Sequence, residues 1–184
     1  AIVIAAVFLF TALFLWSQGR VWWCRAGDYS PWAWNIWTAH NSQHFIDPYS
    51  FTHVLHGVLE FWILTLLFKR IPLGWRLVMA ISFEGVWEIV ENSTRVIEHY
   101  RAETISLEYF GDSILNSLSD MTCCALGFVL GHKLGAWKSA LVFVATELVL
   151  VLTIRDSLVI NIIMLILPMP AVKEAIKHWQ MAVG

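Results

Sequence analysis

The chain has 184 residues, of which 58% are hydrophobic and 14% charged, and its formal net charge is −2. Soluble domains carry roughly 25% charged residues, so this composition excludes an ordinary solvated globule and favours a polytopic membrane protein. Because the sequence holds no basic tail or stripe, we do not expect nucleic acid as a partner.

Apolar stretches predict an all-α bundle of five membrane-spanning helices. A span needs about 20 residues to cross a bilayer, within a range of roughly 17 to 25. The chain opens without Met inside an apolar run, so we expect the first span to be truncated at its start. The five expected spans are 1–17, 51–68, 73–96, 109–134 and 136–154.

Two further segments are expected at the membrane surface. Residues 18–50 hold five tryptophans, and this residue type favours the membrane–water boundary. Residues 158–168 are apolar but too few for an ordinary span, and Pro168 closes the run. We therefore expect a short re-entrant or interfacial helix in this segment.

The three cysteines form no recognisable motif. Cys123 and Cys124 are adjacent inside an apolar run, and Cys24 stands alone in the tryptophan-rich loop. This spacing matches neither a disulfide framework nor a Cys-x-x-Cys metal or redox motif. We expect the adjacent pair to be buried small side chains, and Cys24 has no evident partner in the chain.

The basic residues predict the orientation, because short connectors rich in Lys and Arg stay on the cytoplasmic side. The connector 69–76, "KRIPLGWR", holds three of them, and the connector 131–138, "GHKLGAWK", holds two. The loops 18–50 and 96–108 then face the other side, which is the periplasm in a bacterium. The expected location is the bacterial inner (cytoplasmic) membrane, crossed several times.

Polar side chains interrupt the expected spans near their outer ends. Residues three and four apart share a helix face, so these side chains form one stripe on each of three helices. Charges in lipid cost roughly 2.5–3.5 kcal/mol each, so the stripes should face one another or a wet cavity open to the periplasm. The stripes are His53, His56 and Glu60; Glu84, Glu88, Glu91 and Arg95; and Asp112, Asn116 and Asp120.

The clustered stripes allow a structural and a functional interpretation. They can be a buried polar network that fixes helix register without catalysis. They can also be a site, because two histidines with several carboxylates suit Zn²⁺ or another divalent ion, and equally suit proton transfer. The candidate metal ligands are His53, His56, Glu88, Glu91, Asp112 and Asp120.

The first functional hypothesis is a membrane enzyme or metal-binding protein that acts on an amphipathic, lipid-like substrate in the periplasmic leaflet. We expect His56 and Glu88 as acid/base or ligand groups, with Asp112 as a further catalytic group. Binding of an anionic headgroup is assigned to basic and amide side chains. These substrate-binding candidates are Arg95, Arg155, Asn92 and Asn116.

Two other hypotheses stay open. The chain can be an accessory subunit of a larger respiratory or photosynthetic membrane complex, which would dock through the tryptophan-rich loop and the short last helix. It can also carry protons or ions along Glu60, Glu84 and Glu147, although few other ionisable groups continue such a path inward.

The segment before the second expected span also has two interpretations. Asn41, Gln43, His44 and Asp47 precede the break at Pro48. They can fold over the outer mouth of the site as a lid. Alternatively, Asp47 and Ser50 are ordinary turn and N-cap residues at the start of a helix.

Several segments together resemble the uncharacterised protein family 0314, an alphaproteobacterial membrane family. The resemblance covers about residues 18–180, and it implies a polytopic inner-membrane protein without an established activity. The segments that carry it are "NSQHFIDPYSFTHVLHG", "IPLGWRLVMAISFEGVWEIVENS", "YRAETISLEYFGDSILNSLSD" and "IRDSLVINIIMLILP".

A more distant likeness is to the VanZ-like membrane proteins. Those proteins carry an Asp…His pair before a helix, a Glu late in the next helix and an Asp…Asn element that opens a third. This chain departs from the pattern by a second histidine, a Glu-Asn pair and Asp120, so the likeness suggests a shared fold and polar site and leaves the chemistry open. The corresponding residues are Asp47 with His53 or His56, then Glu88 or Glu91, then Asp112 and Asn116.

Overall fold

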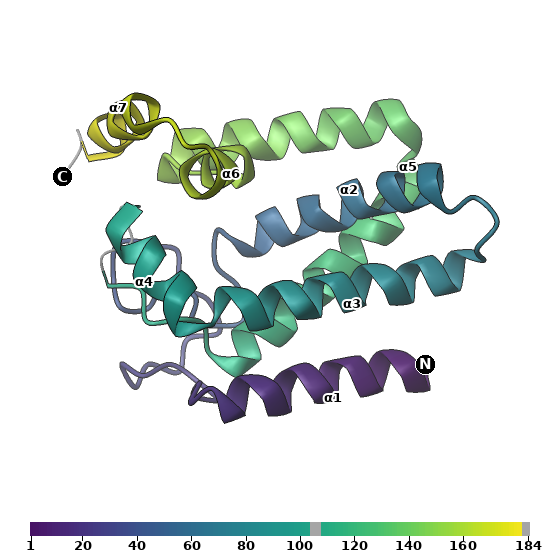
Figure 1. Ribbon diagram of the computed structural model, residues 1–184, viewed down its shortest axis with the longest axis horizontal. Coiled ribbons are helices and arrows are strands. Elements are labelled where there is room, and N and C mark those ends of the chain that lie inside the picture. Colours follow the sequence, from purple (N-terminus) through teal and green to yellow (C-terminus); the bar gives the residue numbers. More distant parts are fainter. Residues whose placement is uncertain (104–107, 182–184) are drawn as a thin grey trace.

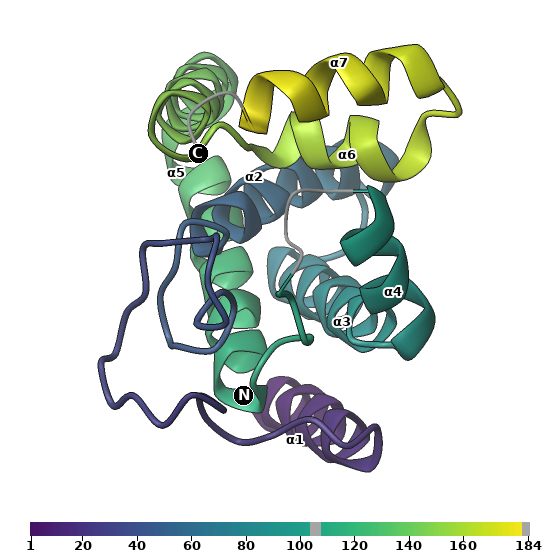
Figure 2. The same ribbon diagram turned by 90° about the vertical axis from the view of Figure 1, so that its left-hand side faces the viewer.

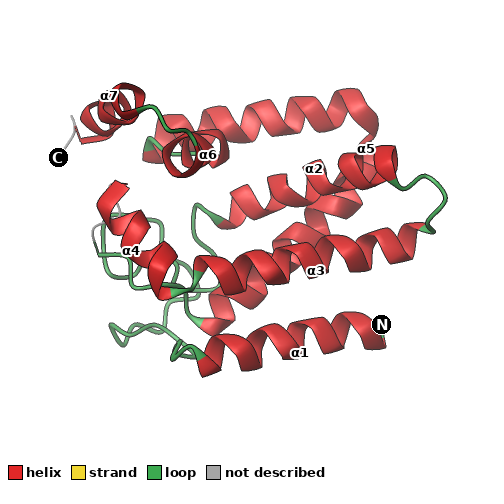
Figure 3. Cartoon of the chain, in the orientation of Figure 1, coloured by secondary structure: helices red, strands yellow, loops and turns green. Residues whose placement is uncertain are grey.

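The computed structural model describes residues 1–103 and 108–181, and these residues are all-α (Figures 1 and 3). They contain no named strand, and one isolated bridge joins Trp32 to Ile46. The predicted all-α class is confirmed. The helices are α1 (Ile2–Ser17), α2 (Ser50–Leu67), α3 (Leu73–Glu91), α4 (Thr94–Glu103), α5 (Ile114–Ile154), α6 (Leu158–Ile166) and α7 (Pro170–Met181).

Helices α2 and α5 pack closely because glycines bring their backbones together. A Cβ atom on Gly57 of α2 would lie 1.9 Å from the carbonyl oxygen of Cys124. A Cβ atom on Gly127 of α5 would lie 1.9 Å from the carbonyl oxygen of Val54. Side chains larger than hydrogen are therefore excluded at both crossing points, as in the small-residue contacts of membrane helices.

Helix α5 consists of two arms that meet at Gly135, the residue between the expected helices 109–134 and 136–154. Gly135 has φ 72° and ψ 174°, a conformation that glycine adopts without a steric penalty. In Figure 1 the two arms of α5 run in different directions, and the second arm runs back above α2. The first arm begins at Ile114 rather than at Tyr109, since Ser113 caps it by accepting a hydrogen bond from the backbone N–H of Asn116.

The expected helix 73–96 is corrected to two helices. Helix α3 ends at Glu91, where the side chain of Asn92 donates to the backbone carbonyl of Glu88, and α4 starts at Thr94. Much of the segment 96–108, expected as a loop, is thus helical, while residues 104–107 lie outside the described part of the chain. Helix α7, after the expected short helix 158–168, was not predicted.

Within the described residues, α2 and α5 are long and apolar enough to cross a membrane by length and composition. Helix α1 is apolar but has only 16 residues. Helix α3 has 19 residues and includes Arg76 and three glutamates. Because of these charged residues, α3 is not among the helices that are apolar enough to cross a membrane.

Candidate functional site

Helices α2, α3, α4 and α6 surround a cavity of about 560 Å³, and Figure 2 shows these four helices around one region of the molecule. The loop 41–49 and the first arm of α5 complete its wall. One part of the lining is polar and the other part apolar. The polar side chains include His53, His56, Glu60, Glu84, Glu91, Asp112 and Asp120, and the apolar ones include Leu59, Ile63, Phe83, Leu158, Ile162, Leu165 and Ile166.

A carboxylate between two histidines forms the polar centre of the cavity. Glu84 of α3 contacts Nδ1 of His53 through Oε1, and its Oε2 lies 3.2 Å from Nδ1 of His56. The two histidines lie three residues apart on α2, so they share the face that points to α3. Glu84 and His53 are buried, whereas His56 is partly exposed. This geometry suits a carboxylate that orients a histidine.

Two buried carboxylates lie on either side of His53 with incomplete hydrogen bonding. Oε1 of Glu88 lies 3.6 Å from Nδ1 of His53, and Oδ2 of Asp120 lies 3.9 Å from its Nε2. Three of their oxygens have no hydrogen-bond partner among the described residues. These are both oxygens of Glu88 and Oδ1 of Asp120. Buried polar atoms rarely stay unpaired, so these oxygens call for a proton, water or a cation.

Asp112 is held by its neighbours at the edge of this centre. The amide of Asn92 donates to Oδ2 of Asp112 over 2.8 Å, and the hydroxyl of Tyr109 donates to Oδ1 over 2.9 Å. The backbone N–H of Asp112 donates in turn to Oδ1 of Asn92. Asn92 therefore connects the end of α3 to the segment before α5. Asp112 lies in this segment and not on α5, where the sequence had placed it.

The segment 41–47 is fixed to the start of α5. The carbonyl of Ser42 accepts a hydrogen bond from the N–H of Ser113, and the carbonyl of His44 accepts one from the amide of Asn116. Oδ1 of Asp47 accepts from the N–H groups of Tyr49 and Ser50, which is the turn role that the sequence also allowed. Burial, with the Asp112 carboxylate adding to it, raises the pKa of Asp47 to about 6.

Most of the site residues expected from the sequence meet around this cavity. His53, His56, Glu91, Asp112 and Asp120 line it. Glu88 is fully buried beside His53, behind the lining. Asn92 and Asn116 are also buried, and both act as positioning side chains through the hydrogen bonds described above.

Arg95 and Arg155, which we expected to bind a headgroup, do not line the cavity, and their role stays a prediction. Arg95 belongs to α4 and is exposed, since α3 ends before it. Arg155 donates from Nη1 to the carbonyl of Trp179, and its guanidinium lies 5.6 Å from the centre of that ring. Its charge thus faces α7 rather than the polar centre.

Glu84 is the central residue that the ligand set from the sequence omits. It lies one turn before Glu88 on the predicted stripe, so the sequence placed it on the correct helix face. Its ligand atoms and those of His53 and His56 lie within 4.8 Å of one another, as do those of His53, Glu88 and Glu91. Either group could hold a metal ion.

The sequence pattern of one protein family, described as "Protein of unknown function (DUF2585)", matches residues 15–182. The chain belongs to this family. Membership in DUF2585 brings no activity with it, so the functional argument rests on the chemistry of the cavity.

Relatives named UPF0314 protein confirm the resemblance to uncharacterised family 0314. One from Paracoccus denitrificans is 42% identical over 176 residues, which cover 96% of this chain and 89% of the relative. One from Brucella anthropi is 39% identical over 180 residues, which cover 98% of this chain and 89% of the relative. No solved structure matches the chain, and the likeness to VanZ-like proteins stays a prediction.

Proposed function

We propose that the protein is a multi-pass protein of the bacterial inner membrane whose cavity binds a divalent metal ion and acts on a lipid-like substrate. The observation that carries the proposal is an imbalance of charge at the polar centre. Five carboxyl side chains line the cavity, whereas no Lys or Arg among the described residues does. Two further oxygens, on fully buried Glu88 beside His53, have no hydrogen-bond partner within the described part of the chain.

The donor set fits a metal of the zinc class. Histidine nitrogens with carboxylate oxygens are ligands that Zn²⁺ accepts, and catalytic zinc sites combine three protein ligands with one open position. Here Nδ1 of His53, Nδ1 of His56 and the Glu84 carboxylate would hold the ion, with Glu88 beside them. A bound ion would polarise a substrate oxygen and lower the pKa of a bound water.

The shape of the cavity supports an amphipathic substrate. Its polar centre lies between α2 and α3, and its apolar wall comes largely from α6. A polar headgroup would face His53 and Glu84 while its chain lies against Ile162 and Leu165. Mostly apolar pockets with a few convergent polar groups are typical of small-molecule sites.

The exposed surface supports contact with lipid. Only 17% of the most apolar 18-residue stretch of α5 is buried, which is little for the core helix of a soluble protein. Helix α1 carries no charged residue and exposes Ile2, Leu9 and Phe10. Large exposed apolar areas mark membrane or protein contacts, so we propose that α1, α2, α3 and both arms of α5 form the five spans.

Metal content tests this proposal directly. The chain, purified in mild detergent and equilibrated with Zn²⁺, should lose about one ion per chain when His53→Ala or Glu84→Gln is introduced. The matched control is His178→Ala, because His178 is exposed and pairs with Glu174 on the same helix. Equal metal content in wild type, both cavity variants and the control would contradict metal binding by the cavity.

Metal-free acid/base catalysis is a second candidate for the same cavity. The contact between Glu84 and His53 favours it, since a carboxylate that orients a histidine is the usual arrangement of a general base. In that case metal content would not change with His53→Ala, but turnover of a lipid-like substrate would still disappear.

An accessory role in a membrane complex is favoured by one different feature. Trp32, Trp34 and Trp37 of the loop before α2 are all exposed, and exposed tryptophans are common at protein interfaces. Gentle solubilisation followed by a native gel and mass spectrometry tests it. Migration of the chain alone would argue against a stable complex.

A further inference from the structure

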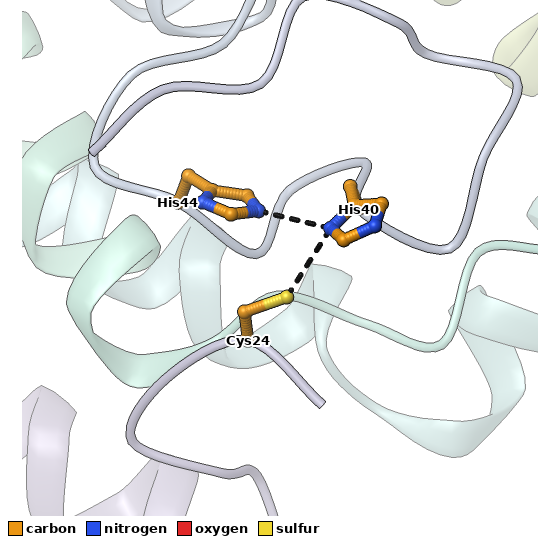
Figure 4. Close-up of side chains that lie close together, drawn as sticks. All are labelled: Cys24, His40 and His44. Carbon is orange, nitrogen blue, oxygen red and sulfur yellow. Dashed lines mark hydrogen bonds between the residues drawn. The ribbon is translucent and has the colours of Figure 1, made fainter. Parts of the chain in front are cut away.

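Three potential metal ligands lie close together in the loop between α1 and α2, although they are far apart in the sequence. They are Cys24, His40 and His44 (Figure 4). Sγ of Cys24 lies 3.4 Å from Nδ1 of His40, and this same nitrogen lies 3.2 Å from Nε2 of His44. The three ligand atoms all lie within 4.8 Å of one another. Figure 4 shows that the thiol of Cys24 and the ring of His44 both point to the same nitrogen of the His40 ring.

The surroundings of His44 leave one of its nitrogens ready to bind a cation. His44 is fully buried, and its Nδ1 lies 2.5 Å from the backbone carbonyl of Ser30. A carbonyl only accepts hydrogen bonds, so Nδ1 carries a hydrogen, and in the neutral ring Nε2 presents its lone pair toward His40. Metal-binding histidines are commonly oriented by such a hydrogen bond from the other ring nitrogen.

Two of the three distances between the donors agree with tetrahedral coordination. From usual zinc bond lengths, two nitrogens on one tetrahedral ion are about 3.3 Å apart, and a sulfur and a nitrogen about 3.6 Å apart. The observed separations, 3.2 Å for His40 to His44 and 3.4 Å for Cys24 to His40, are close to these values. The third pair, Sγ of Cys24 and a ring nitrogen of His44, lies within 4.8 Å.

We propose that Cys24, His40 and His44 bind one Zn²⁺ ion, separately from the cavity between α2 and α3. A thiolate with two imidazoles suits zinc far better than Ca²⁺ or Mg²⁺, which prefer oxygen ligands. On binding, the Cys24 thiol loses its proton to solvent, and the His40 ring moves its hydrogen from Nδ1 to Nε2. Three protein ligands leave the fourth position to water.

The ion would cross-link residues 18–49, a segment with little regular secondary structure. Among the described residues, 18–49 contain no helix and only the isolated bridge from Trp32 to Ile46. Irregular segments of this length are uncommon in compact domains. Coordination of one ion by Cys24, His40 and His44 would link distant parts of this segment. This link would stabilise the folded chain.

The cross-link would also act on the cavity. The carbonyl of His44 accepts a hydrogen bond from Asn116 of α5, and Asn41 and Ser42, between the two histidines, line the cavity. Zinc at Cys24 would therefore hold one wall of the cavity in place. This link does not require the proposed function, because it concerns only the position of the loop.

Cobalt substitution tests the site without any activity measurement. Reduced, chelator-treated protein titrated with Co²⁺ should develop the thiolate-to-cobalt charge-transfer band, which Zn²⁺ then removes. Cys24→Ser should abolish the band, while Cys123→Ser, a change at the half-buried cysteine of α5, should keep it. His53→Ala should also keep it, which separates this site from the cavity. A wild-type protein without the band, or Cys24→Ser with it, would overturn the proposal.

A second measurement uses only the wild-type chain, in case the variants fold poorly. Alkylation of Cys24, located by mass spectrometry, should slow by about tenfold or more when Zn²⁺ is present, because a bound thiolate is a poor nucleophile. Alkylation of Cys123 should not change. Equal rates for Cys24 with Zn²⁺ and with a chelator would contradict the assignment. If Cu²⁺ but not Zn²⁺ gave the protection, the assignment of zinc would also fail.

Discussion

Glu84 on α3 contacts His53 on α2 from a position where nearly all of its carboxylate is shielded from solvent. The same carboxylate reaches His56, so one acidic side chain links both histidines of the cavity. Around this group, the oxygens of Glu88 have no partner among the described residues. The relationship makes the α2–α3 contact both a structural element and the centre of the proposed site.

Removal of the Glu84 side chain should destabilise the fold strongly. Glu84→Ala removes the one carboxylate that contacts both histidines, and breaking a buried pair typically costs about 3–5 kcal/mol. Denaturant or thermal unfolding in detergent measures the change. Glu174→Ala is the control, because the pair of Glu174 with His178 is exposed and should contribute little. Equal stability of both variants would show that Glu84 does not hold the helices together.

Gly57 should not tolerate alanine. A Cβ atom there would overlap the carbonyl oxygen of Cys124, so α2 and α5 would have to separate, at a cost of about 1–3 kcal/mol or more. The control is Gly74→Ala in α3, where the new Cβ meets nothing within 4 Å and alanine favours the helix. Thermal unfolding should place Gly57→Ala below and Gly74→Ala at or above wild type. The reverse order would refute the close approach of the two backbones.

Asp156 should make stability depend on pH. Burial raises the pKa of Asp156 to about 6 although Tyr49 and the N–H of Ser157 donate to the carboxylate. Because the folded-state pKa lies above the ordinary value of 3.8, the folded chain binds this proton more tightly than the unfolded chain. The stabilising contribution is therefore complete below about pH 4, and it is lost as the pH rises toward 6.

The variant Asp156→Asn isolates that contribution, because asparagine cannot lose the proton. Melting temperatures of both proteins, measured between pH 4 and pH 7, should fall with rising pH more steeply for wild type than for Asp156→Asn. Buried Asp47, whose pKa is also raised to about 6, gives both proteins the same background trend. Parallel curves for the two proteins would contradict the role of Asp156.

The apolar wall of the cavity should control lipid binding without affecting metal binding. Leu165→Trp on α6 fills space that the chain of an amphipathic ligand would occupy, so less lipid should copurify with this variant. Leu152→Trp on α5 is the control, because Leu152 is 81% exposed and lies outside the cavity. Mass spectrometry of the extracted lipids provides the comparison. Unchanged lipid in Leu165→Trp would argue against the amphipathic ligand.

Helix periodicity was enough to predict which polar faces meet. His53 and His56, three residues apart, share a face of α2, and Glu84 and Glu88, four apart, share one of α3. The placement of Asp112 and Arg95 failed because helix ends depend on capping. Ser113 starts α5 after Asp112, and Asn92 ends α3 before Arg95. Such side-chain caps are difficult to separate from ordinary polar residues in a single sequence.

The cluster of Cys24, His40 and His44 in the loop before α2 could not be predicted from the sequence, for a different reason. Cys24 meets His40 and His44 across 16 and 20 residues without regular structure, so no period connects them. The meeting depends on tertiary contacts, such as the hydrogen bonds that tie Ser42 and His44 to the start of α5. The spacing rule that recognises paired cysteines gives no signal for such a set.

The metal content of the cavity in a Cys24→Ser background tests the central claim most directly, because the loop site then contributes no ion. This protein, equilibrated with Zn²⁺ and freed of unbound metal, should retain about one ion per chain by mass spectrometry. Addition of His53→Ala should remove that ion, while addition of His178→Ala should leave it bound. A Cys24→Ser protein that folds normally and retains no metal would contradict the account.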